Sequence, residues 1–504
     1  MSDEAVHAAL RSDATLVAIE APAGCGKTHQ GAEYARDAVV TGPFERALIL
    51  THTHAACSVF AERTRGIGSR VEIRTVDSLI AAISSSYHTG LGIPHDPATW
   101  VRQRRDGHAE LAVKAAALVA RYPMIPQALA RRYPVVICDE HQDSSGDQHA
   151  LAMALHDQGA KLRIFADPMQ KIFRENSPLD ASPPCDWDLL LAQAEIAAEL
   201  SNPHRWRSGC PQLGAWTLSA RAALKSGGKI DLRHLPPSIH VIHAENQAQR
   251  NLDYRLSSAD RRPVDGFEAR QSSLLILTRH NFTARALRSV FNRRVPLWEG
   301  HTRAALETLI SVLSAGSTPE TVARAVVSFM GNIGKGFSPS AFGNRLEQEV
   351  REGCSRLARG KPATIQSLAR FIIDEPNHRG VAEMLRRLAD LCEQDIAFAD
   401  VEIDCRREFW EAVRLGTFET PDAGFAEITH RRTYARPKPP ERAISTIHKA
   451  KGLECESAII MPCDAKTFPD KPDARCLLYV ALSRAKSELM LVVSRDNPSP
   501  LFIL

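Results

Sequence analysis

The sequence lacks the features that would direct it to a membrane or to an oxidising compartment. It contains no run of about 18 uncharged apolar residues, so we expect no membrane-spanning helix and no membrane partner. Its first residues, MSDEAVHAALRSDATL, show no basic start followed by an apolar core, which argues against a secretory signal. The eleven cysteines include no C-x-x-C pair, which argues against a zinc ribbon or an iron–sulfur cluster and for reduced thiols. We therefore expect a cytoplasmic protein.

The sequence also lacks a strong charge bias, internal repeats and low-complexity segments. The formal net charge of +4 is too small to indicate a nucleic-acid partner by itself. A chain of 504 residues is too long for one hydrophobic core, so we expect roughly two to four domains. The apolar fraction of 44% and the charged fraction of 24% are typical of a globular protein in water.

A predicted strand, a glycine-bearing loop and a predicted helix follow one another near the N-terminus. The run TLVAIE predicts a buried strand, and the loop APAGCGKT leads into a helix after Thr28. Such a loop binds phosphate oxygens through its backbone, Lys27 adds positive charge, and the hydroxyl of Thr28 suits Mg²⁺. An ordinary turn is the alternative, because Ala21 stands where the strict pattern has its first glycine. The predicted nucleotide-binding residues are Ala21, Pro22, Ala23, Gly24, Cys25, Gly26, Lys27 and Thr28.

A second apolar run, YPVVIC, leads directly into two adjacent carboxylates, Asp139 and Glu140. In P-loop enzymes, a carboxylate at the end of a second strand helps to hold Mg²⁺, and Asp139 fits this role. Glu140 is placed one residue further on, where it can act as the general base that activates water. A solvated loop after a strand is the alternative interpretation. The predicted cofactors are ATP and Mg²⁺.

Further sequence blocks follow in a definite order along most of the chain. They are LTHTHAACSVF from Leu50, RTVDSL from Arg74, DEHQD from Asp139, FADPMQKIF from Phe165, LSNPHRWRS from Leu200, ILTRHN from Ile276, STIHKAKGLECE from Ser445 and LLYVALSRAKSEL from Leu477. Together with APAGCGKT, these blocks resemble the motifs of the UvrD/Rep-type superfamily 1 DNA helicases, in the same order. Any single block is a weak indication, and their joint order carries the resemblance.

The resemblance implies roles for the residues that match the motifs. Gln170 stands where the family senses the γ-phosphate, and Arg205 and Arg484 stand where two arginines stabilise the transition state. His204 aligns with a tyrosine that stacks on the nucleotide base. Gly452 and Glu454 occupy positions that meet the phosphate and the ribose. The implied DNA-binding residues are Thr51, His52, Thr75, Phe173, His448 and Lys449.

The hydrophobic patterns and the resemblance together predict the architecture. Apolar runs alternate with helical segments up to about residue 205, a second set follows, and residues between about 302 and 435 show helical spacing only. We predict an α/β fold of two RecA-like P-loop NTPase motor domains, with an all-helical insertion in the second and a much reduced one in the first. The predicted bounds are 1–205 for the first motor domain, with its insertion at about 82–130, then 206–301 and 436–504 for the second motor domain, and 302–435 for the helical insertion.

The sequence departs from the family pattern where the family recognises the base and stacks on DNA. No glutamine precedes Lys27, whereas the family has one there that recognises adenine, so the choice of nucleotide stays open although ATP is favoured. His52 replaces a stacking aromatic, and Glu175 stands where the family carries Trp or Phe. Trp187 and Trp206 are candidates to take over the stacking.

Three functions remain open at this point. The first is an ATP-dependent DNA helicase and translocase that moves 3′ to 5′ on single-stranded DNA or tailed duplex DNA. The second is a DNA-stimulated ATPase that serves as the sensor subunit of a nuclease-containing bacterial defence or repair complex. The compact size resembles the helicase subunit of Gabija-type anti-phage systems, which implies a nuclease partner. The third is a P-loop ATPase that is not a helicase.

Overall fold

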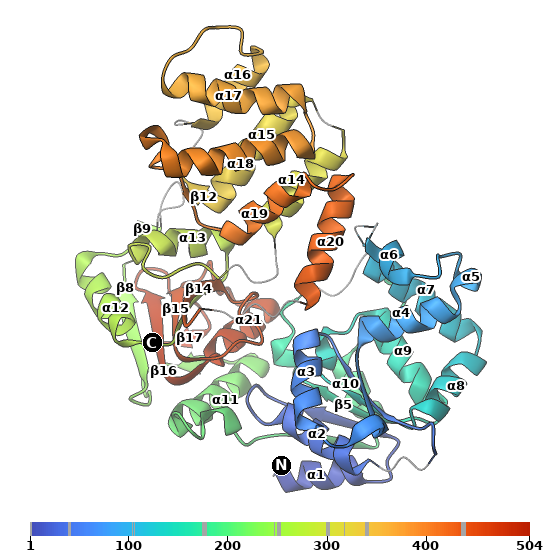
Figure 1. Ribbon diagram of the computed structural model, residues 1–504. Coiled ribbons are helices and arrows are strands. Elements are labelled where there is room, and N and C mark those ends of the chain that lie inside the picture. The colour runs from blue at the N-terminus through green and yellow to red at the C-terminus, as the bar shows by residue number, and fades with distance from the viewer. Residues whose placement is uncertain are drawn as a thin grey trace. The chain divides into compact units, whose positions relative to one another are not determined.

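The computed structural model divides the chain into two units (Figure 1). The first unit contains Met1–Ala98, Asp106–Trp298 and Lys438–Leu504, and the second contains Thr99–Arg105 and Glu299–Pro437. The second unit therefore includes the segment 302–435 that the sequence predicts as a helical insertion. The structure describes residues 3–38, 42–102, 104, 106–173, 179–245, 247–248, 254–298, 303–316, 318–337, 342–434 and 440–504.

The first unit contains two parallel sheets, and the first of them is built from the N-terminal apolar runs. Its six strands are ordered β3-β2-β4-β5-β1-β6, and each is parallel to its neighbours. The strands β1, β2 and β4 are buried along their whole length, as expected for a sheet covered by helices on both faces. Their carboxyl ends lie at one edge, where open α/β sheets bind ligands. The strands are β1 (Leu16–Glu20), β2 (Ala47–Thr51), β3 (Val71–Thr75), β4 (Val135–Cys138), β5 (Lys161–Ala166) and β6 (Ile196–Glu199).

Helices connect these strands, and local capping residues fix several helix starts. Thr53 caps α3, while Ser145 and Gln148 form a capping box at α9. The helices are α1 (Asp3–Arg11), α2 (Lys27–Asp37), α3 (His54–Arg63), α4 (Val76–Ser86), α9 (Gly146–Asp157) and α10 (Trp187–Gln193). Between β3 and β4 lie α5 (His88–Leu91), α6 (Pro97–Arg102), α7 (Gly107–Arg121) and α8 (Met124–Arg132), in the region predicted as a reduced insertion. Short 3₁₀ helices follow β4, β5 and β6, namely η2 (His141–Asp143), η3 (Pro168–Gln170) and η4 (His204–Trp206).

The second sheet combines two segments that lie far apart in the sequence. Its order is β14-β11-β15-β16-β8, again with parallel neighbours. Two of its strands precede the helical unit and three follow it, namely β8 (Ile239–Ala244), β11 (Leu274–Thr278), β14 (Arg442–Thr446), β15 (Cys455–Cys463) and β16 (Ala485–Ser494). Its helices are α11 (Pro211–Lys225), α12 (Ser258–Arg270), α13 (Asn281–Val290) and α21 (Pro472–Leu482). Short strand pairs accompany it, β7 (Ile230–Asp231) with β17 (Phe502–Ile503) and β9 (Gln247–Ala248) with β10 (Tyr254–Arg255).

The second unit is helical and has its own hydrophobic core. Val326, Met330, Leu368, Leu385 and Leu388 are among the fully buried side chains that its helices share. Its elements are α14 (Ala304–Ser314), α15 (Pro319–Ile333), α16 (Asn344–Arg351), α17 (Lys361–Asp374), α18 (His378–Gln394), α19 (Arg406–Leu415) and α20 (Pro421–Tyr434), with the short pair β12 (Gly334–Lys335) and β13 (Glu402–Ile403). The predicted α/β fold class with two parallel sheets is confirmed, and the insertion is helical except for the short pair β12 and β13.

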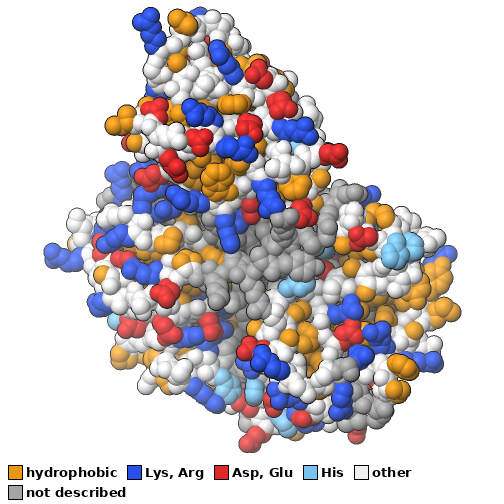
Figure 2. Space-filling view, viewed as in Figure 1, with side chains coloured by type: hydrophobic (Ala, Val, Ile, Leu, Met, Phe, Trp, Pro, Cys, Tyr) orange, Lys and Arg blue, Asp and Glu red, His pale blue; other side chains and the backbone are white. Residues whose placement is uncertain are grey.

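The surface and the helix lengths agree with the composition. Figure 2 shows Lys and Arg side chains intermixed with Asp and Glu over the helical unit, as the small net charge suggests.

In the described part of the chain, none of the helices has both the length and the apolar character needed to cross a bilayer.

Candidate nucleotide site

The loop after β1 has a shape that favours glycine at two positions. Gly24 and Gly26 have φ angles of +74° and +89°, in the left-handed region that other residues rarely adopt. A Cβ at Gly24 would also lie 2.7 Å from the Cβ of Arg205 and 2.8 Å from the ring of Trp206. Gly26 immediately precedes α2, so the N-terminus of this helix opens into the loop, an arrangement that binds phosphate.

The first part of the predicted loop, Ala21 to Ala23, is buried and is anchored through its backbone. The amide of Ala21 donates to the carbonyl of Ala166 at 2.8 Å, and the amide of Ala23 donates to the hydroxyl of Tyr479 at 2.8 Å. Tyr479 belongs to α21 beside the second sheet, and the sequence analysis did not single it out. The loop is therefore fixed from both sheets.

Lys27 contacts the carboxylate pair that follows β4. Its Nζ lies 2.5 Å from Oε1 of Glu140 and 3.9 Å from Oδ1 of Asp139. Burial raises the pKa of Asp139 to about 7, against the opposing charge of Lys27. Burial also acts on Glu140, but the charges of Lys27 and Lys451 outweigh it and lower the pKa of that carboxyl. Glu140 is thus the charged partner of Lys27, and a phosphate that enters the loop must compete with it for the ammonium group.

Asp139 and Thr28 fit the requirements of Mg²⁺. The Oδ1 atom of Asp139 is buried and has no hydrogen-bond partner among the residues that the structure describes. Thr28 stands in the first turn of α2, at the end of the loop, and carries a hydroxyl oxygen. Mg²⁺ prefers oxygen ligands of this kind, with one or two carboxylates and the phosphates of the substrate.

Gln142 orients Glu140, a role that the sequence analysis missed although Gln142 lies in the DEHQD block. Its Nε2 donates to Oε2 of Glu140 at 2.5 Å, and its Oε1 accepts from the amide of Asp167 at 3.0 Å. Gln170 donates to Oδ2 of Asp167 at 2.8 Å. The predicted sensor Gln170 is therefore linked to the predicted base through two residues. Glu140 itself has a φ of +53°, a strained value for a residue with a side chain.

Arg205 and Arg484 both lie near the loop, and they differ in their partners. The Nε of Arg205 is 3.0 Å from Oε2 of Glu454, and its Nη1 donates to the carbonyl of Ser483 at 2.8 Å. Arg484 is 1% exposed and donates to oxygens of its own turn and to the carbonyl of Leu453. Burial and the neighbouring Arg205 lower the pKa of Arg484 to about 10, so it remains a cation at neutral pH. In the described part of the chain no carboxylate forms an ion pair with Arg484, which suits it to an incoming phosphate.

His204 lies beside the same loop, and Glu454 reaches it through Arg205, whose amide donates to the carbonyl of Gly24 at 3.0 Å. The Nε2 of His204 lies 2.7 Å from Oδ2 of Asp3 in α1, and its ring lies 3.1 Å from where a Cβ of Gly26 would be. Glu454 accepts from Lys486 at 2.7 Å in addition to Arg205. Gly452 has a φ of +82° with open space beside it. The structure therefore brings His204 and Glu454, two of the residues predicted for the nucleotide, to the loop.

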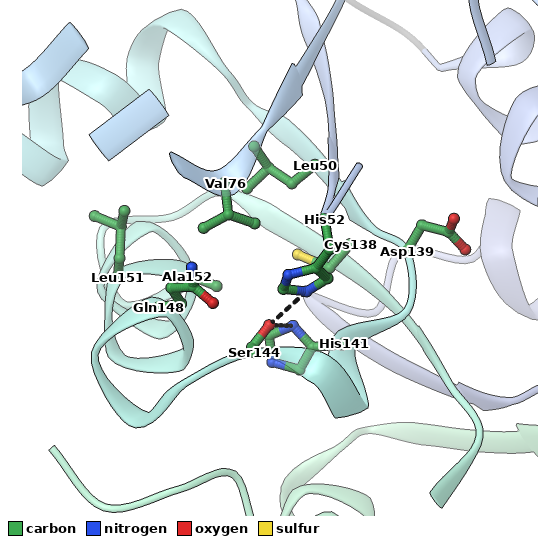
Figure 3. Close-up of a pocket in the computed structure, with 10 residues that line it drawn as sticks. All are labelled: Leu50, His52, Val76, Cys138, Asp139, His141, Ser144, Gln148, Leu151 and Ala152. Carbon is green, nitrogen blue, oxygen red and sulfur yellow. Dashed lines mark hydrogen bonds between the residues drawn. The ribbon is translucent and has the colours of Figure 1, made fainter. Parts of the chain in front are cut away.

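One group of residues predicted for DNA lies at the carboxyl edge of the first sheet. Thr51 and Thr75 end β2 and β3 and pair in register. The hydroxyl of Thr75 caps α4 by accepting from the amide of Ser78 at 3.1 Å. His52 is hydrogen-bonded to Ser144 over 3.1 Å within a small pocket, and Asp139 points away from this pair (Figure 3). Burial lowers the pKa of His52.

A second group joins the segment after η3 to the loop after β14. The rings of Phe173 and His448 have centroids 6.0 Å apart, and Phe173 is 45% exposed. The carbonyl of Lys449 accepts from Nε1 of Trp298 at 3.3 Å. Two of the predicted DNA-binding aromatic rings therefore lie side by side although they come from distant parts of the chain.

The two tryptophans proposed as replacement stacking residues are engaged elsewhere. Trp206 is fully buried, and its Nε1 donates to the carbonyl of Ala485 at 2.7 Å, so the suggestion that it stacks on DNA is wrong. Trp187 is partly buried and donates to Glu20 at 3.2 Å. Glu175 lies outside the described residues.

Lys451 links the second sheet to the first, a contact that the sequence analysis missed. Its Nζ lies 2.6 Å from Oδ1 of Asp143, 2.8 Å from the carbonyl of Gln170, and 5.0 Å from the ring centroid of Phe173. Asp143 belongs to the same short helix as Gln142, which orients Glu140. Lys451 thus connects the predicted DNA-facing ring to the residues predicted for hydrolysis.

We expect Lys451→Met to weaken the effect of DNA on hydrolysis. The methionine keeps an apolar stem but removes the ion pair, so stimulation by single-stranded DNA should fall on the order of tenfold while basal hydrolysis changes little. Lys229→Met, at an exposed position in the same unit, is the matched control. Equal stimulation in the Lys451 variant and the wild-type protein would contradict this role.

A buried arginine holds the carboxyl ends of β1, β5 and β6 together. Arg221 of α11 lies 2.9 Å from Oδ1 of Asp167 and 2.8 Å from Oε1 of Glu199, and it also pairs with Glu20. Lys225 is a second partner of Glu20. The side chains of Arg221 and Glu20 are each 5% exposed. Each charge is therefore stabilised mainly by its buried partner and little by water.

We expect Arg221→Met to destabilise the protein, because it leaves buried carboxylates without their partner. Removing one member of a buried ion pair typically costs about 3–5 kcal/mol of the free energy of unfolding. Urea unfolding monitored by circular dichroism should show an earlier first transition. Arg233→Met removes an exposed arginine that pairs with Asp231, and it should leave the transition unchanged.

Comparisons with known proteins agree with the geometry of the two halves of the site. Residues 2–175 match the model of an AAA domain, and residues 443–492 match that of a UvrD-like helicase C-terminal domain. The first match includes Lys27 and the pair Asp139 and Glu140, and the second includes Arg484.

Among solved structures, the chain is similar to the crystal structure of the Arterivirus nonstructural protein 10 (helicase). The TM-score is 0.34 at 10% sequence identity, and the match covers 96% of this chain and 61% of that chain. The chain therefore spans about three fifths of that helicase. None of the curated proteins matches the sequence. Two segments of the chain are thus similar to an AAA domain and to the C-terminal domain of UvrD-like helicases.

Proposed function

We propose that the protein is an ATP-driven translocase and helicase that moves 3′ to 5′ on single-stranded DNA. The observation that carries this proposal is the convergence of residues from both sheets on one phosphate-binding loop. Lys27, Asp139 and Glu140 come from the first sheet, whereas Arg484 comes from the second and is a buried cation. A site divided in this way can couple hydrolysis to a change in the contact between the two sheets.

The roles of the residues follow from their positions. The loop amides and Lys27 bind the phosphates of ATP, so Lys27 leaves Glu140, which is then free to act on water. Glu140 accepts one proton as water attacks the γ-phosphorus, and the bond to the bridging oxygen breaks to release ADP. Mg²⁺, held by Asp139 and Thr28, would neutralise negative charge on the phosphates. Arg205 and Arg484 stabilise the charge that develops on the transferred group.

The path from DNA to the hydrolytic residues runs through a small number of contacts. A base stacked on Phe173 would lie against His448 and close to Lys451. Lys451 binds Asp143 and the carbonyl of Gln170, and Gln170 is linked through Asp167 and Gln142 to Glu140. Occupation of the stacking position can therefore change the orientation of the general base.

Two measurements test this proposal on the full chain. Hydrolysis of ATP should increase when single-stranded DNA is added, and a duplex with a 3′ tail should be displaced while one with a 5′ tail or blunt ends is not. An equal rate of ATP hydrolysis with and without DNA would refute the helicase assignment and favour a P-loop ATPase of another kind. Displacement from the 5′ tail alone would refute the polarity.

A second function, that of a DNA-sensing ATPase subunit, is favoured because several predicted stacking residues are already hydrogen-bonded or buried. His52 is hydrogen-bonded to Ser144, and Trp206 is buried, which leaves Phe173 and His448 as the described rings at the predicted DNA contacts. With few stacking contacts, the isolated chain should unwind only short duplexes even though DNA stimulates its ATPase. This is the behaviour of a DNA-sensing ATPase subunit that works with a nuclease. Processive unwinding of long duplexes by the purified chain would contradict it.

A further inference from the structure

Two histidines and a cysteine lie together beside the predicted catalytic residues, and nothing in the proposed hydrolysis uses them. They are His141 in η2, His149 in α9 and Cys185 in the segment before α10. The Nε2 of His141 is 2.9 Å from the Nδ1 of His149, and the ligand atoms of all three residues lie within 4.8 Å of one another. A tetrahedral zinc ion with bonds of about 2.0–2.3 Å holds its ligand atoms roughly 3.3–3.6 Å apart. Small side-chain movements would therefore place all three atoms around one ion.

The segment that carries Cys185 is held in place on both sides. Asp147, in the first turn of α9, accepts from the amides of Ala181 and Ser182, each at 3.1 Å. Gly146 permits this close approach, because a Cβ there would lie 2.0 Å from the carbonyl oxygen of Ser182. On the other side, Asp186 caps α10. The thiol is thus presented by a segment anchored to the helix that carries His149.

The orientation of His141 also suits a metal ligand. The Nδ1 of His141 lies 3.3 Å from the hydroxyl of Ser144 (Figure 3). This leaves Nε2 for the contact with His149. Metal-binding histidines usually bind such an outer partner through their second nitrogen, which fixes the ring. His141 is 3% exposed, whereas His149 and Cys185 are partly exposed, so an ion could enter from their side.

We infer that His141, His149 and Cys185 form a binding site for one zinc-type transition-metal ion. Two imidazoles and a thiolate match Zn²⁺ and Co²⁺, whereas Mg²⁺ and Ca²⁺ prefer oxygen ligands. A solvent molecule would complete four-coordination. The ion would tie the segment before α10 to η2, which begins directly after Glu140. This inference does not depend on the helicase assignment.

Cobalt substitution tests the site in the full chain. The reduced protein is stripped with a chelator and titrated with Co²⁺, and we expect a thiolate-to-cobalt charge-transfer band that saturates at one equivalent and disappears when Zn²⁺ is added. Cys185→Ser should remove the band, and Ser144→Ala should weaken affinity by about 10–100-fold. Cys392→Ser, at a partly buried cysteine of the helical unit, should leave the band unchanged. Absence of a band at one equivalent, or an equal band in Cys185→Ser, would overturn the inference.

A measurement on the wild-type chain avoids any folding defect of the variants. One equivalent of Zn²⁺ should slow the alkylation of Cys185, followed by mass spectrometry, and leave the alkylation of Cys210 unchanged, since both cysteines are partly exposed. Equal alkylation of Cys185 with and without Zn²⁺ would show that the cluster is a hydrogen-bonded pair of histidines beside an unrelated thiol.

Discussion

Replacement of Glu140 by glutamine is expected to stop ATP turnover while nucleotide binding is kept or becomes tighter. Glutamine cannot accept the proton from water, and loss of a general base typically lowers the rate by about 10²–10⁴-fold. The substitution also removes the carboxylate that lies 2.5 Å from Lys27, so phosphate no longer competes with it for the ammonium group. Asp139 remains to hold Mg²⁺. Steady-state hydrolysis with DNA present and binding of a fluorescent nucleotide measure the two effects.

A matched variant separates this effect from a general loss of charge. Glu33→Gln makes the same chemical change in α2, at a position where the side chain is 44% exposed and pairs only with Arg36 among the described residues. It should hydrolyse ATP at the wild-type rate. Hydrolysis by Glu140→Gln at the rate of this control would remove Glu140 from the role of base, whereas a loss of nucleotide binding would point to a structural role for its carboxylate.

Replacement of Arg484 by alanine is expected to lower kcat by about 10³–10⁵-fold, the range found for arginines that stabilise the transition state of phosphoryl transfer. The affinity for nucleotide should change little, because Lys27 and the loop amides supply the binding in the ground state. Arg484 is buried and donates to oxygens of its own turn and to the carbonyl of Leu453, so part of its hydrogen bonding must be given up when a phosphate approaches. Single-turnover hydrolysis with DNA measures the chemical step.

Two further variants separate catalysis from folding at this position. Arg484→Lys keeps a buried positive charge but loses the forked geometry of the guanidinium, so it should fold normally and still be strongly impaired. Arg495→Ala removes an arginine that is 50% exposed in the same unit, and it should retain activity. A kcat of Arg484→Lys equal to that of the wild-type protein, with an intact thermal transition, would exclude Arg484 from the site.

The sequence predicts the nucleotide site well because its parts follow strands that lie close together in one sheet. In the order β4-β5-β1, Lys27 follows β1 and Asp139 follows β4, and both leave the carboxyl edge. Five- and six-residue apolar runs suffice to locate these strands, since strands buried on both faces are almost continuously hydrophobic. The helical spacing between the two parts of the second sheet likewise predicts the insertion.

Contacts made by single side chains across the fold could not be predicted in the same way. Lys451 and Asp143 are separated by 308 residues, and His204 and Asp3 by 201 residues. A sequence block shows that a lysine or a histidine is present. Its partner depends on how the two sheets pack and on which rotamer the packing allows for that side chain. The same reason explains why Trp206, which looks like a stacking residue in the sequence, is a core residue under the phosphate-binding loop.

The strand order of the second sheet has a consequence for how the chain is made. β8 and β11 do not pair with each other, since β11 lies between β14 and β15, and β8 pairs with β16. During synthesis, both strands leave the ribosome before their partners β14, β15 and β16 are translated. Their edges stay unpaired until the whole helical unit has been synthesised. The first sheet and the helical unit can fold in the meantime, because domains generally fold as units in the order of synthesis. We therefore expect an intermediate during synthesis in which the first sheet and the helical unit are folded while β8 and β11 still have unpaired edges. Chaperones should bind the nascent chain at that stage.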